Sequence, residues 1–79
     1  MTNSQTLTLS DVPIGTRVRI HRLSARPEVS RRLRELGLCE QAIVSCVLKG
    51  HGNIICALDN ARIGLDRRLA GTIIVSPFE

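Results

Sequence analysis

Aromatic residues are almost absent from this 79-residue sequence. It contains no Trp and no Tyr, and its single Phe, Phe78, stands next to the C-terminal residue. The hydrophobic core must therefore be aliphatic. Because a chain of this size buries only about 60–65% of its unfolded surface, we expect one thin core in a single domain. Apolar residues still make up 43% of the chain, which favours a folded domain over a disordered one.

Long hydrophobic runs and export signals are also missing. No apolar run approaches 18 residues, so the sequence predicts no transmembrane helix. The N-terminus, MTNSQTLTLS, lacks the basic start and apolar segment of a signal peptide. Three cysteines, Cys39, Cys46 and Cys56, cannot all pair within one chain. We therefore expect free thiols and a cytoplasmic location.

The residue patterns of catalysis are missing as well. No nucleophile stands beside a base, no paired carboxylates lie in a Gly-rich setting, and the Gly50-His51-Gly52 turn does not match a phosphate-binding loop. The chain has only two histidines and little room for a deep cleft. We expect a protein that is not an enzyme.

The first element predicted is a half-buried strand. Val12 to Gly15 suits a type I turn, with proline second and glycine fourth. After it the chain alternates, so that Val18 and Ile20 share one face while Arg17 and Arg19 share the other. This alternation is typical of a strand with one face in the core.

A helix follows over residues 27–36. It opens with proline, which is tolerated at the first helical position, and its apolar residues recur at helical spacing. Gly37 fits the left-handed position after a helix, and Leu38 would then fold back on Leu33 in a Schellman motif.

The remainder of the chain predicts short strands joined by tight turns. Asp59-Asn60 suits a hairpin turn, and Asp66 can cap a short helical turn that Gly71 ends. The fold class predicted is mainly β, a small and strongly bent barrel of about five strands with one helix between the first and second. We expect residues 1–5 to be disordered and residues 6–79 to form the barrel. The strands expected after the helix are 42–49, 54–58, 63–65 and 73–75.

The order of these elements resembles the FeoA family of small SH3-like domains associated with bacterial ferrous iron transport. The matching stretches are LSDVPIGTRVRI (9–20), RRLRELGL (31–38), the apolar strand after it, and ARIGLDRRLAGTIIV (61–75). The resemblance implies an SH3-like barrel that serves as a cytoplasmic accessory of ferrous iron uptake. It also implies a partner, the membrane permease with a GTP-binding domain that is called FeoB in this family.

The sequence departs from the family pattern in two places. Family members often carry a Pro-Leu-Gly-Asp-Pro-like loop between the second and third strands, where this chain has the shorter Lys49-Gly50-His51-Gly52-Asn53. Outward strand positions that are often charged in the family are apolar here, at Ile43, Val47 and Ile55.

Metal binding is one alternative. Cys39, after the helix cap, and His51, at a loop tip, are the candidate ligands for Fe²⁺ or Zn²⁺. A lone exposed thiol and a loop histidine are usually incidental, so no cofactor is expected but a metal-sensing module stays open. Cys46 and Cys56 share the parity of the core positions on their strands, which predicts small buried side chains. The inward set predicted for the two strands is Val44, Cys46, Leu48, Ile54, Cys56 and Leu58.

Nucleic-acid binding is a second alternative. The formal net charge of +4, the pI of 9.8 and the run Arg31, Arg32 and Arg34 all fit it. Single-strand binders of this size, however, rely on aromatic stacking, for which this sequence has no residues within its strands. Glu28 and Glu35 also offer the helix arginines acidic partners at i,i+4. Nucleic acid is therefore the less favoured partner.

A protein-binding surface is the interpretation that the sequence favours. Ile43, Val47 and Ile55 are predicted to lie outside the barrel on neighbouring strands, and exposed apolar patches usually mark interfaces. Arg31 or Arg34 would add orientation at the rim toward an acidic partner. Cover from the helix or the N-terminal segment, or pairing in a homodimer, would remove the same patch from water.

Overall fold

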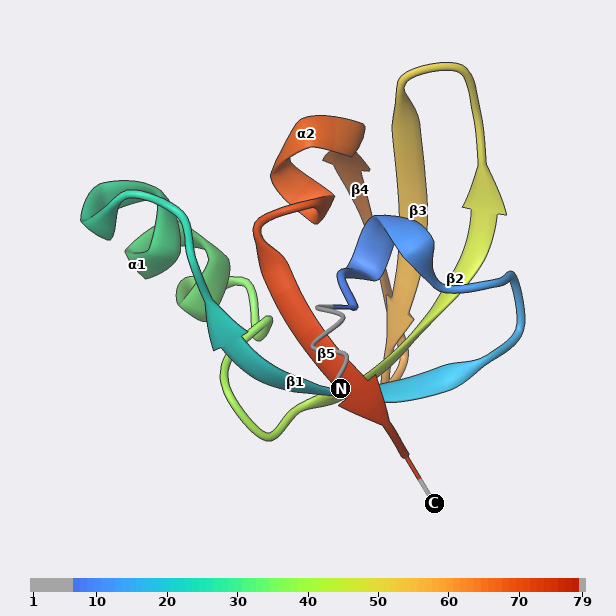
Figure 1. The fold of residues 1–79 in the computed structure, drawn as a ribbon, viewed down its shortest axis with the longest axis horizontal. Helices are drawn as coiled ribbons and strands as arrows, with labels where there is room; N and C mark the ends of the chain where they lie inside the picture. Colours follow the sequence, from blue (N-terminus) through green and yellow to red (C-terminus); the bar gives the residue numbers. More distant parts are fainter. Residues whose placement is uncertain (1–6, 79) are drawn as a thin grey trace, which may run out of the picture.

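The computed structural model describes residues 7–78, which form one five-stranded antiparallel sheet with a nine-residue helix and two short helical turns (Figure 1). The predicted class is confirmed, because the long helix lies between the first and second strands. The elements are η1 (Leu9–Asp11), β1 (Arg17–Leu23), α1 (Pro27–Glu35), β2 (Ile43–Lys49), β3 (Asn53–Leu58), β4 (Ala61–Asp66), α2 (Arg67–Ala70) and β5 (Ile73–Pro77).

The sheet has the strand order β4-β3-β2-β1-β5 and bends around the core. β1 pairs with β2 through Arg17 to Arg19 and with β5 from Val18 onward, so it belongs to both halves of the barrel. A register shift between Ile20 and Arg22 marks a bulge, which bends a strand and increases its twist. β4 and β5 are left as the two edges of the sheet.

The core is aliphatic, as the composition predicts, and every helix and strand contributes to it. Leucine, isoleucine and valine fill the interior together with Cys46 and Cys56. Phe78 lies outside this set, where the guanidinium groups of Arg17 and Arg19 stand over its ring at 4.8 and 5.5 Å from the centroid. The buried residues are Leu9, Val12, Val18, Ile20, Leu33, Leu38, Val44, Cys46, Ile54, Cys56, Leu65, Ala70, Ile73 and Val75.

The turn before β1 lies one residue later than predicted. The N–H of Thr16 donates to the carbonyl of Pro13 at 3.2 Å, so the turn spans 13–16 and not 12–15. Gly15, with φ of +91°, occupies its third position, where positive φ favours glycine. The Gly15 N–H donates to the carbonyl of Cys46 at 2.8 Å, which ties the turn to β2 and sets its register.

The predicted Schellman cap at the end of α1 is confirmed. Gly37 has φ of +97°. The N–H of Leu38 donates to the carbonyl of Leu33 at 2.9 Å, and that of Gly37 donates to Arg34 at 3.0 Å. Leu33 and Leu38 are both buried, so the cap also closes one end of the core.

β2 contains a bulge that the alternation of its sequence does not show. Cys46 pairs with Cys56, but the next pair is Leu48 with Ile55, which leaves Val47 as the extra residue. In a bulge of this kind two residues lie opposite one on the partner strand, so the inside–outside alternation shifts. The prediction that Leu48 faces the core is wrong, because 54% of it is exposed.

The other predicted turns are present. Asp59 and Asn60 form a two-residue turn between β3 and β4 in which Asp59 has φ of +55°. The Asp66 carboxylate accepts the N–H of Arg68 at 2.7 Å and caps α2, and Gly71 follows the last helical residue. Neither α1 nor α2, the helices within residues 7–78, is long and apolar enough to cross a bilayer.

We predict that Gly37→Ala destabilises the protein more than Gly15→Ala. Both glycines have positive φ, so the backbone strain of placing alanine there costs about 1 kcal/mol in each case. A Cβ on Gly37 would also lie 2.7 Å from Cδ2 of Leu58, whereas a Cβ on Gly15 would meet nothing within 4 Å. The Leu58 side chain must therefore shift to make room, which adds a further cost at Gly37 alone. Urea denaturation of both variants measures the difference, and equal losses would show that the cap does not press on the core.

Candidate functional site

The two candidate metal ligands lie far apart. Cys39 precedes β2 and His51 follows it, so the seven-residue strand separates them by roughly 20 Å. Within residues 7–78, no three His, Cys, Asp or Glu side chains come together closely enough to hold an ion. Cys39 and His51 therefore cannot share one metal in this structure.

Cys46 and Cys56 lie directly opposite each other on β2 and β3, and both are fully buried, as predicted. Their thiols donate weakly to the carbonyls of Leu48 at 3.7 Å and Ile63 at 3.6 Å. Burial raises the pKa of the Cys56 thiol to about 11, and the adjacent Cys46 adds to that rise. The Cys56 thiol is therefore protonated at neutral pH, whereas metal binding and nucleophilic attack need a thiolate.

Arg34 ties the helix to the segment that follows it. Its Nε and Nη2 donate to the two carboxylate oxygens of Glu40 at 3.2 and 2.9 Å. The hydrogen bond from Arg34 lowers the pKa of the Glu40 carboxyl to about 2, and Glu40 raises the pKa of Arg34. A bidentate pair of this kind holds one geometry better than a lysine would. Arg34 thus has a structural partner, whereas Arg31 on the same helix is exposed.

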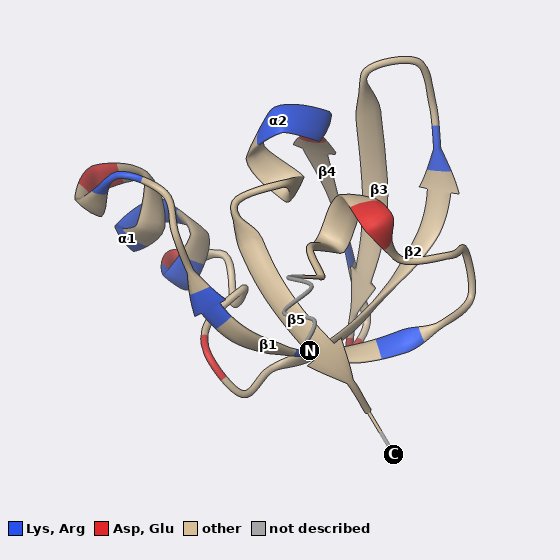
Figure 2. Cartoon of the chain, viewed as in Figure 1, with Lys and Arg blue, Asp and Glu red and all other residues tan. Residues whose placement is uncertain are grey.

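The ion pairs expected within the helix are replaced by others. In residues 7–78 the pairs are Arg34–Glu40, and Arg26–Glu28 at 4.0 Å. The predicted i,i+4 partners of Glu28 and Glu35 are not among them. Arg31 and Arg32 consequently have no acidic partner in the described part of the chain. Figure 2 shows that α1 carries both basic and acidic positions.

The turn after α1 contains a strained residue. Gln41 has φ of +78°, a conformation that costs a residue with a Cβ about 1 kcal/mol or more. Its N–H donates to the carbonyl of Ile20 at 2.8 Å, and the N–H of Ile20 donates to Ala42 at 2.9 Å. Arg19 adds a side-chain bond to the Gln41 Oε1 at 3.4 Å. These contacts with β1 hold the turn in place.

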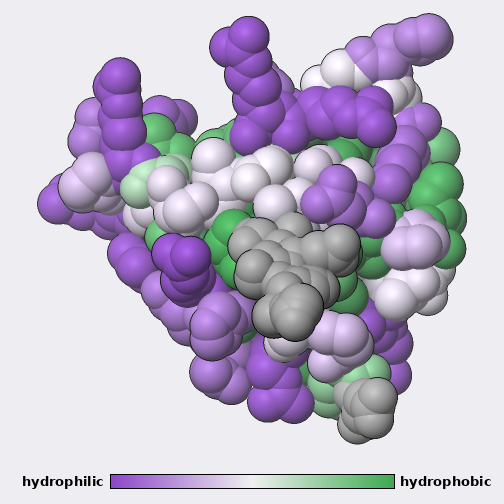
Figure 3. All heavy atoms as spheres, viewed as in Figure 1, coloured by the Kyte–Doolittle hydropathy of each residue, from purple (hydrophilic) through white to green (hydrophobic). Residues whose placement is uncertain are grey.

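The bulge gathers apolar side chains on the outer face of the sheet. Val47 and Leu48 both lie opposite Ile55, and we call these three residues the outer β2–β3 patch. Val47 and Ile55 are half-buried, and Leu48 is the most exposed of the three. The turn that carries Ile14, itself 56% exposed, is hydrogen bonded to β2 just before the bulge. Figure 3 shows apolar surface along the edge of the molecule where β2 runs.

The five predicted partner-binding residues fall into two groups. Val47 and Ile55 lie together in the outer β2–β3 patch. Ile43 begins β2 opposite Arg19, four residues and about 13 Å before Val47. Arg34, through Glu40, lies at this same end of β2, and Arg31 is on the helix beside it. The sequence alone could not predict that Leu48 belongs with Val47 and Ile55, because only the bulge in β2 turns its side chain outward.

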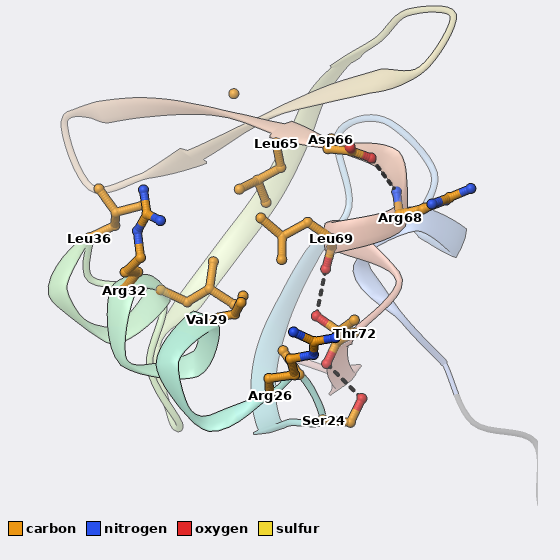
Figure 4. Close-up of a pocket in the computed structure, with 13 residues that line it drawn as sticks. Ser24, Arg26, Val29, Arg32, Leu36, Leu65, Asp66, Arg68, Leu69 and Thr72 are labelled. Carbon is orange, nitrogen blue, oxygen red and sulfur yellow. Dashed lines mark hydrogen bonds between the residues drawn. The ribbon is translucent and has the colours of Figure 1, made fainter.

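A groove is the feature that sequence reasoning missed. It encloses about 840 Å³ between α1, β4 and α2 (Figure 4). Its apolar lining comes from Val29, Leu36, Leu65 and Leu69, which lie on three different elements. The helical periodicity gave no sign of the groove, because it placed Leu36 on the apolar stripe expected to face the core. In the structure, 53% of Leu36 is exposed.

The bent five-stranded sheet, with a helix inserted after its first strand, defines this protein as a small SH3-like barrel. Residues 7–77 match the FeoA domain family. The chain belongs to the FeoA family, as the order of its elements indicates. A search of curated proteins gave no match.

Solved structures agree with this assignment. The FeoA protein of Chlorobium tepidum superposes with a TM-score of 0.86 and 25% identity over 92% of this chain and 71% of its own. FeoA of Stenotrophomonas maltophilia, crystallised with zinc and described as a candidate activating factor of ferrous iron transport, has a TM-score of 0.79 and 28% identity over 89% of both chains. A manganese-dependent transcriptional repressor shares the fold at a TM-score of 0.84 and 22% identity, over 96% of this chain and 43% of its own.

We predict that a thiol reagent labels only Cys39 rapidly in the native protein. Cys46 and Cys56 are fully buried, and Cys39 is half-buried. Absorbance after addition of an aromatic disulfide near pH 8 should show one fast equivalent, and three in denaturant. Fast reaction of all three would mean that β2 and β3 open readily.

We predict that Glu40→Gln lowers the melting temperature at neutral pH and that the difference from the native protein shrinks in acid. The pKa of Glu40 is depressed in the folded protein, so its pair with Arg34 stabilises the fold at pH values above about 4.3, the pKa of an unfolded glutamate. This stabilisation is lost as the pH falls toward 2. Glu28→Gln is the matched control, because Glu28 is highly exposed and its contact with Arg26 is 4.0 Å long. Equal effects of the two variants at pH 6 would contradict a structural role for Glu40.

Proposed function

We propose that this chain is a non-catalytic cytoplasmic accessory of ferrous iron uptake that binds the cytoplasmic part of the membrane permease FeoB and modulates transport. Membership of the FeoA family supports a role in ferrous iron transport. A description of the Stenotrophomonas maltophilia relative as a candidate activating factor supports the direction of that role.

The observation that carries the proposal is the outer β2–β3 patch. Leu48 exposes about half of its surface next to Val47 and Ile55, and the bulge that presents it leaves the core intact. A domain this small gains little from its core, so exposed aliphatic side chains carry a solubility cost that an interface would remove. An apolar centre is what the buried part of a protein interface requires.

Arginines supply basic charge at the far end of β2, beyond Ile43. Ile43 extends the apolar positions toward Arg19, and Arg31 and Arg34 stand at the same end on α1. Arg34 already forms an ion pair with Glu40, so Arg31 is the more available of the two to an acidic partner. Charges at a rim steer the encounter and raise the association rate more than they raise affinity. We therefore place the centre of the interface at Leu48 and its rim toward α1.

We predict that Leu48→Asp weakens permease binding without unfolding the barrel. Because the side chain is 54% exposed, the melting temperature should stay nearly unchanged, while a charge at the centre of an interface should weaken binding by about tenfold or more. Calorimetric titration against the purified cytoplasmic domain of the cognate permease measures the affinity. Ile55→Lys, at the half-buried neighbour, should give the same loss with some loss of stability.

Leu36→Asp is the matched control for this experiment. Leu36 is equally exposed, at 53%, but it lies on α1 in the groove and away from the outer β2–β3 patch. It should bind the permease domain normally. If Leu36→Asp loses binding while Leu48→Asp keeps it, the interface is in the groove and our placement is wrong.

A further inference from the structure

The groove between α1, β4 and α2 has a shape and a chemistry that the outer β2–β3 patch does not share. Its α1 wall presents Val29 and Leu36, and Leu65 and Leu69 approach from the opposite side (Figure 4). An apolar hollow of about 840 Å³ is large for a chain of 79 residues. This volume falls within the range of about 300–1,000 Å³ that is typical of ligand-binding pockets.

The backbone of β4 borders this groove with unused hydrogen-bonding groups. β4 is an edge of the sheet, paired only with β3. In the antiparallel ladder the Arg67 N–H donates to the carbonyl of Gly52 at 2.9 Å. The backbone N–H and C=O groups of the odd-numbered residues of β4 therefore point toward β3. Gly64 is even-numbered and lies opposite Ile55 in a pair without backbone hydrogen bonds, so the N–H and C=O of Gly64 point away from β3. Three consecutive residues, Gly64 to Asp66, line the groove, which therefore reaches the edge of the strand and not one of its faces alone.

Gly64 itself has no internal reason to be glycine. Its φ is not in the left-handed region, and a Cβ built on it would meet nothing within 4 Å. Neither the backbone conformation nor packing inside the chain therefore requires the missing side chain. Glycine in the interior of a strand, where it weakens the strand, often marks a place where another backbone approaches closely.

The charge of the groove is positive. Arg26, Arg32 and Arg68 are among its lining residues, against the single acid Asp66. The Asp66 carboxylate already accepts the Arg68 N–H at 2.7 Å as the cap of α2. In Figure 4 the guanidinium of Arg32 stands beside Leu36 on the groove side of α1, whereas Arg68 points away. Arg32 has no acidic partner within residues 7–78.

We propose that this groove binds an extended acidic segment of a partner protein, which adds as a sixth strand to the free edge of β4. The partner's backbone would pair with Arg62 and Gly64, its aliphatic side chain would lie between Leu36 and Leu65, and a carboxylate would bind Arg32. Strand addition gives affinity through backbone hydrogen bonds and specificity through alternate side chains. The site goes beyond the permease interface at Leu48 and uses a different surface, so either can fail without the other.

A fluorescein-labelled hexapeptide, Ser-Val-Ser-Glu-Ser-Glu, is the probe. Its length matches a typical strand, and because residues two apart share one face of a strand, its valine and glutamates lie on the same face, as Leu36 and Arg32 do in the groove. Fluorescence polarisation with the full chain should show saturable binding, weakened about tenfold or more when lysine replaces glutamate. Binding should also be lost when alternate backbone amides of the probe are methylated, because methylation removes the donors but keeps the side chains. A methylated probe that binds equally well would overturn strand addition.

Two pairs of variants locate the site. Arg32→Gln should weaken the probe about fivefold or more, and Arg31→Gln, the same change at the adjacent exposed residue of α1, should leave it unchanged. Gly64→Pro should abolish binding, because the N–H it removes faces away from β3 and toward the partner. Gly64→Ala keeps that N–H and has open space for its Cβ in the free chain, so it should fold normally and only weaken binding, because the Cβ would crowd the partner's backbone.

Three further outcomes bear on whether the groove is the binding site. Equal weakening by Arg31→Gln and Arg32→Gln would show that only net charge attracts the probe, and would overturn the assignment to the groove. If Gly64→Pro does not fold, the methylated probe and the arginine pair still decide the question on the native chain. If sedimentation shows a dimer that Gly64→Ala retains and Gly64→Pro breaks, and no probe binds, the edge of β4 serves a second copy and the proposal is wrong.

Discussion

The left-handed turn at Gly37 governs how the rest of this small barrel is assembled. It reverses the chain so that Leu38 returns to Leu33, and the two leucines close one end of a core that has no aromatic residue to fill it. The same reversal delivers residues 39–42 to β1, where Gln41 and Ala42 bond to Ile20 and fix the start of β2. The cap thus connects α1 to the start of β2, while the other end of α1 continues from β1 (Figure 1).

One extra residue in β2 has an effect of comparable size. Up to Cys46 the strand alternates as its sequence indicates, with Val44 and Cys46 in the core. Beyond the bulge at Val47 the alternation is inverted, so Leu48 leaves the core and joins Ile55 outside. A bulge adds twist and bends its strand, which a barrel of five short strands needs in order to wrap around its interior. The apolar face proposed to bind the permease is thus a by-product of the curvature of the sheet.

The arginines of this basic chain have several distinct roles. Arg34 is held by Glu40, and Arg17 and Arg19 stand over the ring of Phe78. Arg32 faces the groove, and Arg31 projects from α1. A single explanation for the net charge, such as a phosphate-binding face, does not fit basic residues that are spread over several separate helices and strands (Figure 2). The two proposed protein-binding surfaces would use Arg31 and Arg32 separately, in keeping with a family of accessory SH3-like domains.

Local features were predictable from the sequence because their causes lie within a few residues. Strand alternation at Val18 and Ile20, the proline start and glycine stop of α1, the Asp66 cap and the burial of Cys46 and Cys56 all follow from periodicity and turn chemistry. Four features needed the tertiary structure. They are the register of the turn at Gly15, the outward Leu48, the pairing of Arg34 with Glu40, and the groove at β4. The turn, Leu48 and the groove depend on contacts between segments distant in sequence or on a change of strand register. The Arg34–Glu40 pair spans only six residues, but it forms across the chain reversal at Gly37. Periodicity within one segment contains no information about any of these.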